Sequence, residues 1–386
     1  MRPIRILQVL EATIGGTKRH LLDLCTLLDP EQFEVTVACP RIRSEPHGDT
    51  SFVAELREAG IAVEFVPMVR RINPFADARA LWRMAGVVRR GRYDIIHAHS
   101  SKAGFVGRPA ALFDRRARVV YSPHGFYFLN FKSPHKIAVF KWVERLAGRS
   151  TDVLIALSKG EHAEALRQRV IPSERLRLVE NGIAHLECLP CAEARARLDV
   201  PLDIPVVGTI SRFTPQKAPF DLIEAAARLI ADRPNLQFLW FGDGEMRSAV
   251  EDEIERRGLS AAIRLLGYRE DARALLPALD VFVLASRWEG LPYTIMETMD
   301  AGVPVVGTDV VGTQDFIDPD RNGVLVPVGD PARLAAAIDD LLTRPEHAAI
   351  IAAAAARDVG GRFNRAEMVQ KTAAIYTELA RDLARG

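Results

Sequence analysis

Cysteine is scarce in this chain, with four in 386 residues. Four cysteines do not make a disulfide framework at this length, so we expect a protein of a reducing compartment, the cytoplasm. The sequence also lacks an apolar run of the roughly 18 residues that a membrane-spanning helix needs. The apolar stretch at the N-terminus is short and runs into Gly15 and Gly16, which predicts a first β-strand rather than a signal peptide.

A metal site has little support in the sequence. Cys188-x-x-Cys191 follows His185, but a structural zinc ion takes four ligands and no second pair has suitable spacing. We therefore expect ordinary thiols at Cys188 and Cys191. His97 and His99 would share one face of a strand, and with no third ligand apparent we expect them to serve packing and loop hydrogen bonds.

The net charge is only +1, but it is unevenly distributed. Residues 1–185 carry +10 and the remainder carries −9. A basic half beside an acidic half predicts that the first half meets an anionic partner. We do not expect nucleic acid, because the aromatic residues are not arranged as a recognisable binding module.

Short apolar runs alternate with helical patterns along the whole chain. This alternation predicts an α/β protein with parallel sheets buried on both faces. The expected strands are Ile4–Leu10, Glu34–Ala38, Ala62–Val66, Asp94–Ala98, Arg118–Ser122, Val153–Ala156, Val206–Ile210, Gln237–Phe241, Ile263–Leu266, Val281–Leu284, Val303–Gly307 and Gly323–Val326.

The alternation pauses at residues 183–204, where two prolines and a polar helical stretch occur without a strand. We place the domain boundary there and expect two doubly wound domains, 1–185 and 186–364, followed by a helix over 365–386. Ligands of such sheets bind beyond the carboxyl ends of the strands, so a cleft between the domains is the expected site.

Glu289 and Glu297 lie in the segment ASRWEGLPYTIMETMDA, which follows the strand Val281–Leu284. Pro292 suits the first position of a helix, which leaves Glu289 on the loop and Glu297 about a turn and a half inside. Free amides near Gly290 and Leu291 would attract a phosphate, and a carboxylate can accept hydrogen bonds from a vicinal diol. The alternative is that Glu289 caps the helix and Glu297 is a solvated surface residue.

Four further segments follow strands. Arg212 and Lys217 lie on a strand-to-helix loop, where two cations would neutralise a diphosphate unless they simply face solvent. The turn Phe241–Glu245 either contacts a ligand or is a tight turn with a helix cap at Asp243. Gly15 and Gly16 would allow close approach of a ligand. His124, in Pro123-His-Gly125, either binds a sugar hydroxyl or is a structural histidine.

These segments occur in one order that resembles family 4 of the retaining glycosyltransferases, with the GT-B architecture. The resemblance covers nearly the whole chain and is most specific over residues 205–330. The motifs are Gly15-Gly16, IIHAHSSKAG (95–104), PHG (123–125), ALSKGE (156–161), ENGI (180–183), the Arg212/Lys217 loop, FGDGE (241–245) and Glu289-x7-Glu297 with AGVPVVGT (301–308).

The resemblance implies a role for each position. Glu297 would bind the ribose hydroxyls of a nucleotide sugar and Glu289 the transferred sugar. Arg212 and Lys217 would hold the diphosphate, while the segment at Gly267-Tyr268 would pass the base. The remaining implied site residues are Gly15, Gly16, His124, Gly290, Leu291 and Pro292. The last helix would cross back onto the N-terminal domain.

The resemblance also implies retention of configuration, with a UDP-sugar preferred and a GDP-sugar next. No Asp-x-Asp motif appears at a strand end, so we expect no metal cofactor. Ala184 replaces an Asp that many relatives have, and the loop EGLPYTIME departs from their EGFGLPxLE, which bears on the donor sugar.

We expect a lipid-linked glycan acceptor on the N-terminal domain, at the inner face of the cytoplasmic membrane. Basic and aromatic residues in Met68–Arg92 and Phe126–Trp142 suit an anionic interface, although core aromatics with solvated charges are the alternative. Two other functional classes stay open: a sugar-nucleotide epimerase or hydrolase, and a non-catalytic glycan- or nucleotide-binding subunit.

Overall fold

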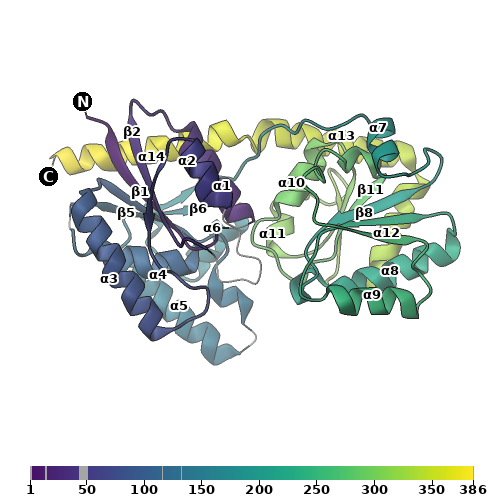
Figure 1. The fold of residues 1–386 in the computed structure, drawn as a ribbon, viewed down its shortest axis with the longest axis horizontal. Helices are drawn as coiled ribbons and strands as arrows, with labels where there is room; N and C mark the ends of the chain where they lie inside the picture. The colour runs from purple at the N-terminus through teal and green to yellow at the C-terminus, as the bar shows by residue number, and fades with distance from the viewer. Residues whose placement is uncertain (1, 14, 43–50, 115, 132, 386) are drawn as a thin grey trace. The chain divides into compact units, whose positions relative to one another are not determined.

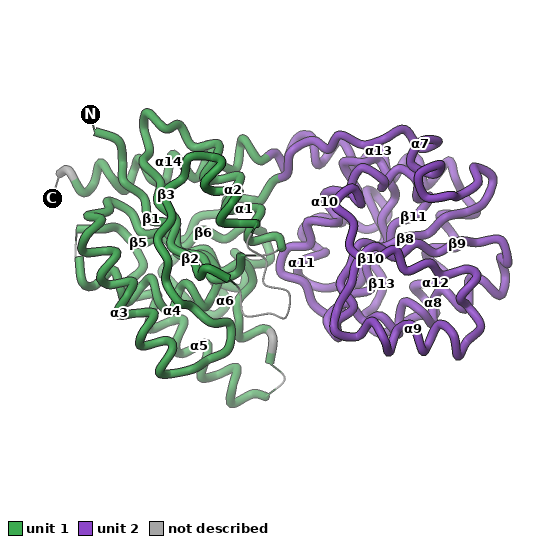
Figure 2. Tube along the Cα trace, viewed as in Figure 1, with its two compact units in different colours: residues 1–182, 365–386 green, residues 183–364 purple. Residues whose placement is uncertain are grey.

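The computed structural model describes residues 2–13, 15–42, 51–114, 116–131 and 133–385. The chain forms two compact units, Met1–Gly182 with Arg365–Gly386 and Ile183–Asn364 (Figure 2). The first division falls three residues before the boundary expected at 185/186. The chain therefore passes from one unit to the other twice, and its last helix belongs to the first unit.

The first unit contains a seven-stranded parallel sheet in the order β3-β2-β1-β4-β5-β6-β7 (Figure 1). Neighbouring residues Ile6 and Leu7 on β1 are both fully buried and belong to separate core clusters on the two faces of the sheet. This explains why the strand sequences show little polar alternation. The strands are β1 Ile4–Leu10, β2 Phe33–Cys39, β3 Ala62–Phe65, β4 Ile95–His99, β5 Arg118–Ser122, β6 Val153–Ala156 and β7 Leu176–Leu178.

Helices cover both faces of this sheet. The helix α4 contacts β1, β4 and β5 on one face, with α3 and α5 beside it. The helices α1 and α14 contact each other on the other face, where Tyr376 is fully buried. The helices are α1 Gly16–Leu27, α2 Ser51–Glu58, α3 Pro74–Gly91, α4 Ser100–Ala111, α5 Pro134–Gly148, α6 Lys159–Arg167 and α14 Arg365–Arg385.

A buried ion pair joins α4 to α5. The Nη2 atom of Arg108 lies 2.9 Å from Oε2 of Glu144, and both side chains are fully buried. The hydroxyl of Tyr121 donates to the same carboxylate at 3.1 Å, and the guanidinium lies over the Tyr121 ring. A buried charge is tolerated only when paired in this way, so α5 is held against the unit by its inner face.

The second unit contains a six-stranded parallel sheet in the order β10-β9-β8-β11-β12-β13. The strands are β8 Val206–Ile210, β9 Gln237–Phe241, β10 Ile263–Gly267, β11 Val281–Leu284, β12 Val305–Thr308 and β13 Val324–Val326. The helices are α7 Cys191–Arg197, α8 Pro219–Asp232, α9 Arg247–Arg256, α10 Tyr293–Asp300, α11 Val311–Gln314, α12 Pro331–Thr343 and α13 Pro345–Arg362. The helices α8, α9 and α12 share a core with one face of the sheet, while α10 and α13 share a core with the other.

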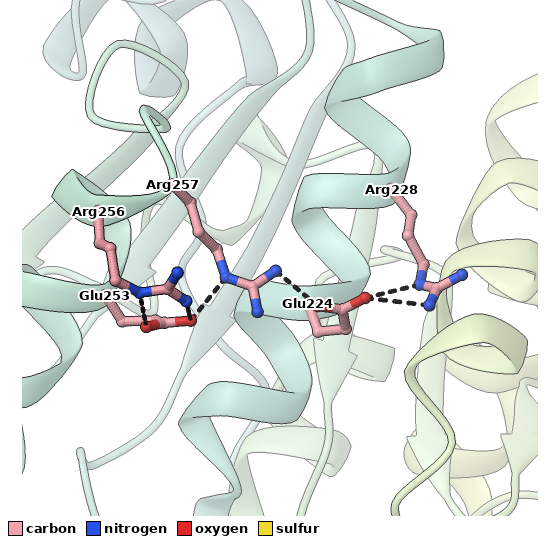
Figure 3. A network of polar contacts seen from close by, with 5 residues as sticks. All are labelled: Glu224, Arg228, Glu253, Arg256 and Arg257. Atoms are coloured by element: carbon pink, nitrogen blue, oxygen red, sulfur yellow. Dashed lines mark hydrogen bonds and ion pairs between the residues drawn. The ribbon is translucent and has the colours of Figure 1, made fainter.

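An exposed network of charges links α8 to α9 (Figure 3). Arg257 pairs with both Glu224 and Glu253, at 2.5 and 2.6 Å. Hydrogen bonds from Arg256 and Arg257 lower the pKa of Glu253 to about 2. The network joins two helices on one face of the second sheet, but it lies at the surface, where screening limits its contribution to stability.

The predicted two-domain α/β architecture is confirmed. Every expected strand forms, with ends that shift by at most two residues. The short strand β7 and its neighbouring turn were not predicted, because Leu176–Leu178 is a three-residue edge strand with only one buried residue. So short a run is hard to distinguish from a loop by pattern alone.

Candidate functional site

Glu289 lies on the loop between β11 and α10, at the carboxyl edge of the second sheet. The helix begins at Tyr293, one residue later than expected, because Pro292 has a non-helical ψ of 89° and occupies the N-cap position. The expectation that Pro292 is the first helical residue is therefore wrong. No side chain caps α10, which also rules out the alternative that Glu289 is the cap.

Lys217 and Glu289 form a nearly buried ion pair. Their Nζ and Oε1 atoms lie 2.5 Å apart, and the side chains are 15% and 6% exposed. Lys217 ends the 3-10 turn that follows β8, so the pair joins two loops at one sheet edge. Such a pair holds each charge in a fixed direction, which suits recognition of a polar ligand.

The two loops are also joined through their backbones. The Nε2 atom of Gln216 donates to the carbonyl of Trp288 at 3.0 Å, and the N–H of Arg287 donates to the carbonyl of Gln216 at 2.8 Å. These contacts flank the ion pair on both loops. The position of Glu289 therefore depends on tertiary contacts as well as on its own loop.

Gly312, on α11, packs directly against Glu289. A Cβ atom at Gly312 would lie 2.8 Å from the backbone carbon, the carbonyl oxygen and the Cβ of Glu289. No larger residue fits there without displacing Glu289. Sequence reasoning did not select Gly312, although its position four residues beyond β12, at the same sheet edge, was an available signal.

Arg212 is exposed, unlike Lys217, and follows β8. Its loop is held by the glycine turn after β9. Ser211 donates its N–H to the carbonyl of Phe241 at 2.9 Å. A Cβ on Gly242 or on Gly244 would clash with the backbone of the Arg212 loop, at 2.1 and 2.5 Å.

The glycines of FGDGE thus allow two backbones to meet. The helix cap expected at Asp243 is wrong, because α9 starts at Arg247 with Met246 before it. The Asp243 carboxylate instead accepts the N–H of Gly244 at 2.7 Å. The turn supports the loop that presents Arg212.

Glu297 is buried inside α10, with its side chain 3% exposed. The alternative of a solvated helix face is therefore wrong. Its Oε1 atom lies 2.7 Å from Nε of Arg273, a half-exposed residue that sequence reasoning missed. Nothing in the local sequence around Arg273 indicated this pairing, which depends on how the 268–275 loop folds back.

The remaining predicted residues of this unit flank the pair. Gly290 is exposed, Leu291 is half-buried, and both precede the uncapped start of α10. Tyr268 is 79% exposed and follows Gly267, whose φ of 69° is favourable only for glycine. Six polar or aromatic side chains therefore follow β8, β10 and β11 in the second unit. They are Arg212, Lys217, Tyr268, Arg273, Glu289 and Glu297.

Gly15 and Gly16 start α1 in the first unit. Gly15 has a φ of 76° and is the N-cap, and among the described residues no side chain fills the space where its Cβ would lie. This leaves the first amides of α1 approachable, as the prediction of a close ligand requires. The residue before Gly15 lies outside the described residues.

His124 is held in a left-handed conformation, with a φ of 53°. The next residue, Gly125, donates its N–H to Oε1 of Glu161 at 2.7 Å, and Leu157 donates to Oε2 at 2.8 Å. Ser158 caps α6 by accepting the N–H of Glu161. The ALSKGE motif thus acts as a support for the turn that presents His124.

Four histidines gather behind this turn. His99 lies 3.1 Å from His124 between ring nitrogens, its ring centroid is 3.9 Å from that of His97, and His20 from α1 completes the group. No third ligand beside His97 and His99 was apparent from the sequence, but His20 and His124 lie next to His99, because α1 and the His124 turn converge at the end of β4. Burial lowers the pKa of all four rings, which favours neutral imidazoles.

The group continues as a buried hydrogen-bonded chain to α14. The Nε2 atom of His99 contacts Oε1 of Gln8 at 2.8 Å, and Nε2 of Gln8 donates to the Tyr376 hydroxyl at 3.0 Å. The same hydroxyl lies 2.6 Å from Nδ1 of His97. The C-terminal helix is thereby tied to the turn that bears His124.

Cys188 and Cys191 form no metal site with His185 in the described part of the chain. The Sγ atom of Cys188 faces the carbonyl of Arg273 at 3.8 Å, while Cys191 begins α7 and is exposed. His185 contacts Asp300 at 3.0 Å, which raises the pKa of its ring.

The two units match family models of known proteins. The family model of glycosyl transferases group 1 matches residues 192–358, and that of a glycosyl transferase 4-like domain matches residues 15–182. The chain is 28% identical over 325 residues to the UDP-Gal:alpha-D-GlcNAc-diphosphoundecaprenol alpha-1,3-galactosyltransferase of Escherichia coli, covering 82% of each chain.

Two solved structures share the fold over nearly the full length. The HepE protein of Anabaena superposes with a TM-score of 0.82 at 23% identity, covering 97% of this chain and 100% of that one. Sucrose-phosphate synthase from Thermosynechococcus elongatus superposes with a TM-score of 0.81 at 21% identity, covering 97% and 99%.

Proposed function

The chain belongs to the family 4 glycosyltransferases of the GT-B fold, and from this premise we propose that it moves a hexosyl group from a nucleoside diphosphate sugar to an acceptor hydroxyl with retention of configuration. The observation that carries the proposal is the ion pair between Lys217 and Glu289. It presents a carboxylate and an ammonium on one edge, as a sugar hydroxyl and an adjoining phosphate would require.

In the proposed reaction, the bond between the anomeric carbon and the diphosphate oxygen breaks first. Lys217, Arg212 and the amides at the start of α10 stabilise the charge that develops on the departing diphosphate. The acceptor oxygen then bonds to the same face of the anomeric carbon, and its proton passes to the departing phosphate oxygen. Glu289 orients the transferred sugar and Glu297 the ribose. As the family pattern implies, the Gly16 amide approaches the phosphate, and His124 lies near the transferred sugar and the acceptor.

Two substitutions test this assignment. We expect Glu289→Gln and Lys217→Ala to lower kcat by at least 100-fold, because each removes a charge placed at the reacting groups. Glu346→Gln and Lys371→Ala, at two separate exposed residues, are controls that should leave kcat unchanged. The anomeric configuration of the product is determined by NMR, and a product with inverted configuration would refute the retaining mechanism.

We propose that the reaction needs no divalent metal, since Lys217 and Arg212 take the place of the cation. Activity in excess chelator should equal that in buffer. A loss that a divalent ion restores would refute this point while leaving the transferase assignment intact.

A UDP-sugar is the preferred donor, with a GDP-sugar next. The name of the E. coli relative specifies UDP-Gal, and HepE of Anabaena was crystallised with UDP-glucose. A thermal-shift screen of nucleotide sugars tests the choice, because a ligand that binds the native state raises Tm. A larger shift with a GDP-sugar than with every UDP-sugar would reverse the preference.

A lipid-linked glycan is the proposed acceptor, bound by the basic first unit. The name of the E. coli relative includes a diphosphoundecaprenol-linked GlcNAc. Within the described residues, no helix is long and apolar enough to cross a membrane. We propose that contact with a membrane is made by surface residues of the first unit.

We propose that exposed aromatic side chains on α3 and α5 form the surface that meets such a membrane. Phe75 and Trp82 on α3 are 91% and 75% exposed, and Trp142 on α5 is 62% exposed. Phe126 and Phe128 are buried, so the alternative of core aromatics holds for these two rings of the Phe126–Trp142 segment. Lys132 of that segment lies outside the described residues.

The α3 and α5 aromatics can be tested with anionic liposomes. We expect Trp82→Ala with Trp142→Ala to weaken co-sedimentation at low salt, because both rings lie among exposed arginines and lysines. Ile350→Ala, an equally exposed apolar residue of the second unit, is the matched control. Wild-type protein that stays in the supernatant would contradict the membrane surface.

A further inference from the structure

Three histidine rings of the first unit direct one nitrogen each toward a common point. His20, His99 and His124 each offer a nitrogen, and these three atoms lie within 4.8 Å of one another. The Nδ1 atom of His99 and the Nε2 atom of His124 are 3.1 Å apart. The rings come from α1, the end of β4 and the turn after β5, so the group exists only in the folded unit.

The other nitrogens of the two buried rings are already engaged by amide oxygens. The Nε2 atom of His99 contacts Oε1 of Gln8, and Nδ1 of His20 contacts Oδ1 of Asn181, both at 2.8 Å. A carbonyl oxygen only accepts, so the proton of each ring is on the engaged nitrogen. Nδ1 of His99 and Nε2 of His20 are then left with lone pairs.

This is the arrangement by which proteins orient histidines that bind metals: one nitrogen donates to a carbonyl or carboxylate while the other binds the ion. Burial also lowers the pKa of the three rings, which keeps them in the neutral form that metals require. Imidazole nitrogens suit Zn²⁺, Cu²⁺ and Ni²⁺.

We propose that His20, His99 and His124 bind one Zn²⁺ ion with a fourth position open to solvent. At a Zn–N distance of about 2.0–2.1 Å, two ligands of a tetrahedral site are about 3.3 Å apart. The His99–His124 separation already matches, and His20 approaches by roughly 1.5 Å from the 4.8 Å limit. The proton on Nε2 of His124 moves to Nδ1 of the same ring when the metal binds.

Bound metal would hold His124, which the proposed function places at the transferred sugar. We therefore expect Zn²⁺ to inhibit transfer when bound at one ion per chain, and chelator to restore activity. This part rests on the proposed function, whereas metal binding itself does not. It is compatible with catalysis that requires no metal, because the ion acts at a residue of the site and not as a cofactor.

The test uses the full chain without an affinity tag, with Cys188→Ser and Cys191→Ser to remove the accessible thiols. Zn²⁺ affinity is measured by competition with a chromophoric chelator, and Co²⁺ absorption reports a tetrahedral nitrogen site. We expect one ion per chain. His20→Gln and His124→Gln should each weaken binding by more than the roughly 10–100-fold that loss of an orienting partner costs.

His135→Gln, an exposed histidine on α5, is the matched control and should bind as tightly as the parent. Asn181→Leu should weaken binding by roughly 10–100-fold, because His20 loses the partner that orients it. Thermal unfolding without metal verifies that each variant is folded. If the His20 variant does not fold, the His124→Gln variant still tests the site, because His124 is only half-buried.

Binding that is unchanged in the His20 and His124 variants would overturn the proposal, as would no binding beyond that of a triple His20/His99/His124→Gln chain. Stoichiometric binding that leaves kcat unchanged would support the metal site and remove His124 from the reaction. Inhibition by Zn²⁺ in the His20 variant at the parental concentration would show that inhibition arises elsewhere.

Discussion

Substitution of Gly312 by alanine tests how the second unit holds Glu289. The new Cβ would lie 2.8 Å from three atoms of Glu289, whereas ordinary contacts begin at 3.4 Å. Glu289 must therefore retreat by about 0.6 Å or push α11 away by the same amount. Because two of the three atoms are backbone, rotation of the Glu289 side chain cannot relieve the clash.

This displacement moves the Glu289 carboxylate away from its ion-pair contact with Lys217. A misplacement of about 1 Å at a reacting centre costs up to about 100-fold in rate, so we expect kcat to fall roughly 10-fold or more. Overpacking costs about 1–3 kcal/mol of stability, partly offset because alanine favours a helix over glycine by roughly 0.5–1 kcal/mol. The variant should therefore fold while turning over slowly.

The assay is release of the nucleoside diphosphate at saturating donor and acceptor, together with urea unfolding. Gly360→Ala is the matched control, because Gly360 lies inside α13 with open space around the new Cβ. It should keep kcat and gain roughly 0.5–1 kcal/mol. Wild-type kcat in a folded Gly312→Ala enzyme would refute the dependence of catalysis on the position of Glu289.

Further predictions concern the supports of both units. Tyr376→Phe leaves two buried polar partners without the hydroxyl they share, so urea unfolding should show a loss of about 1–3 kcal/mol. Arg273→Ala removes one partner of the Glu297 carboxylate and should raise the donor KM with little change in kcat; a fall in kcat at unchanged KM would contradict a role in binding. Glu161→Gln can accept only one of two backbone N–H groups, so kcat and Tm should fall together, and a change in neither would remove its supporting role. The pKa of Glu253 is about 2 when folded and 4.5 when unpaired, so its contribution is present above pH 4.5 and is lost as the pH falls toward 2; Glu253→Gln should flatten the acid limb of unfolding.

The ion pair between Lys217 and Glu289 has a consequence for donor binding. A ligand that places a phosphate beside Lys217 must share the ammonium with the carboxylate, or replace it. A nearly buried pair is already desolvated, so the enzyme loses little further hydration when the ligand arrives. Preorganisation of this kind depends on the two loops staying bonded to each other.

Much of the fold could be predicted because its signals are local. Runs of Val, Ile, Leu and Phe that lack alternation indicate strands covered on both faces, and glycines or prolines mark their ends. The order of these runs predicts two parallel sheets. The edge strand β7 escaped prediction, because three residues with one buried side chain carry too little pattern.

The candidate site was only partly predictable. Glu289, Glu297, Arg212 and Lys217 follow strands of one parallel sheet, whose carboxyl ends must lie on one edge, so their grouping could be foreseen. Which of these side chains contact one another could not be predicted. From the sequence, we expected Glu297 to face solvent or a ligand. In the structure, helix packing buries its side chain, and Arg273 from another loop forms an ion pair with it.

The sequence by itself determined the chain's architecture, its charge division and the residue types at each sheet edge, because periodicity and strand order are properties of the chain alone. Tertiary structure alone decided that Gly312 presses on Glu289, that FGDGE supports the Arg212 loop and that His20 joins His99 and His124. The physical reason is distance along the chain. Contacts between residues that lie tens to hundreds of positions apart depend on how helices pack on the sheet, and no local pattern encodes that packing.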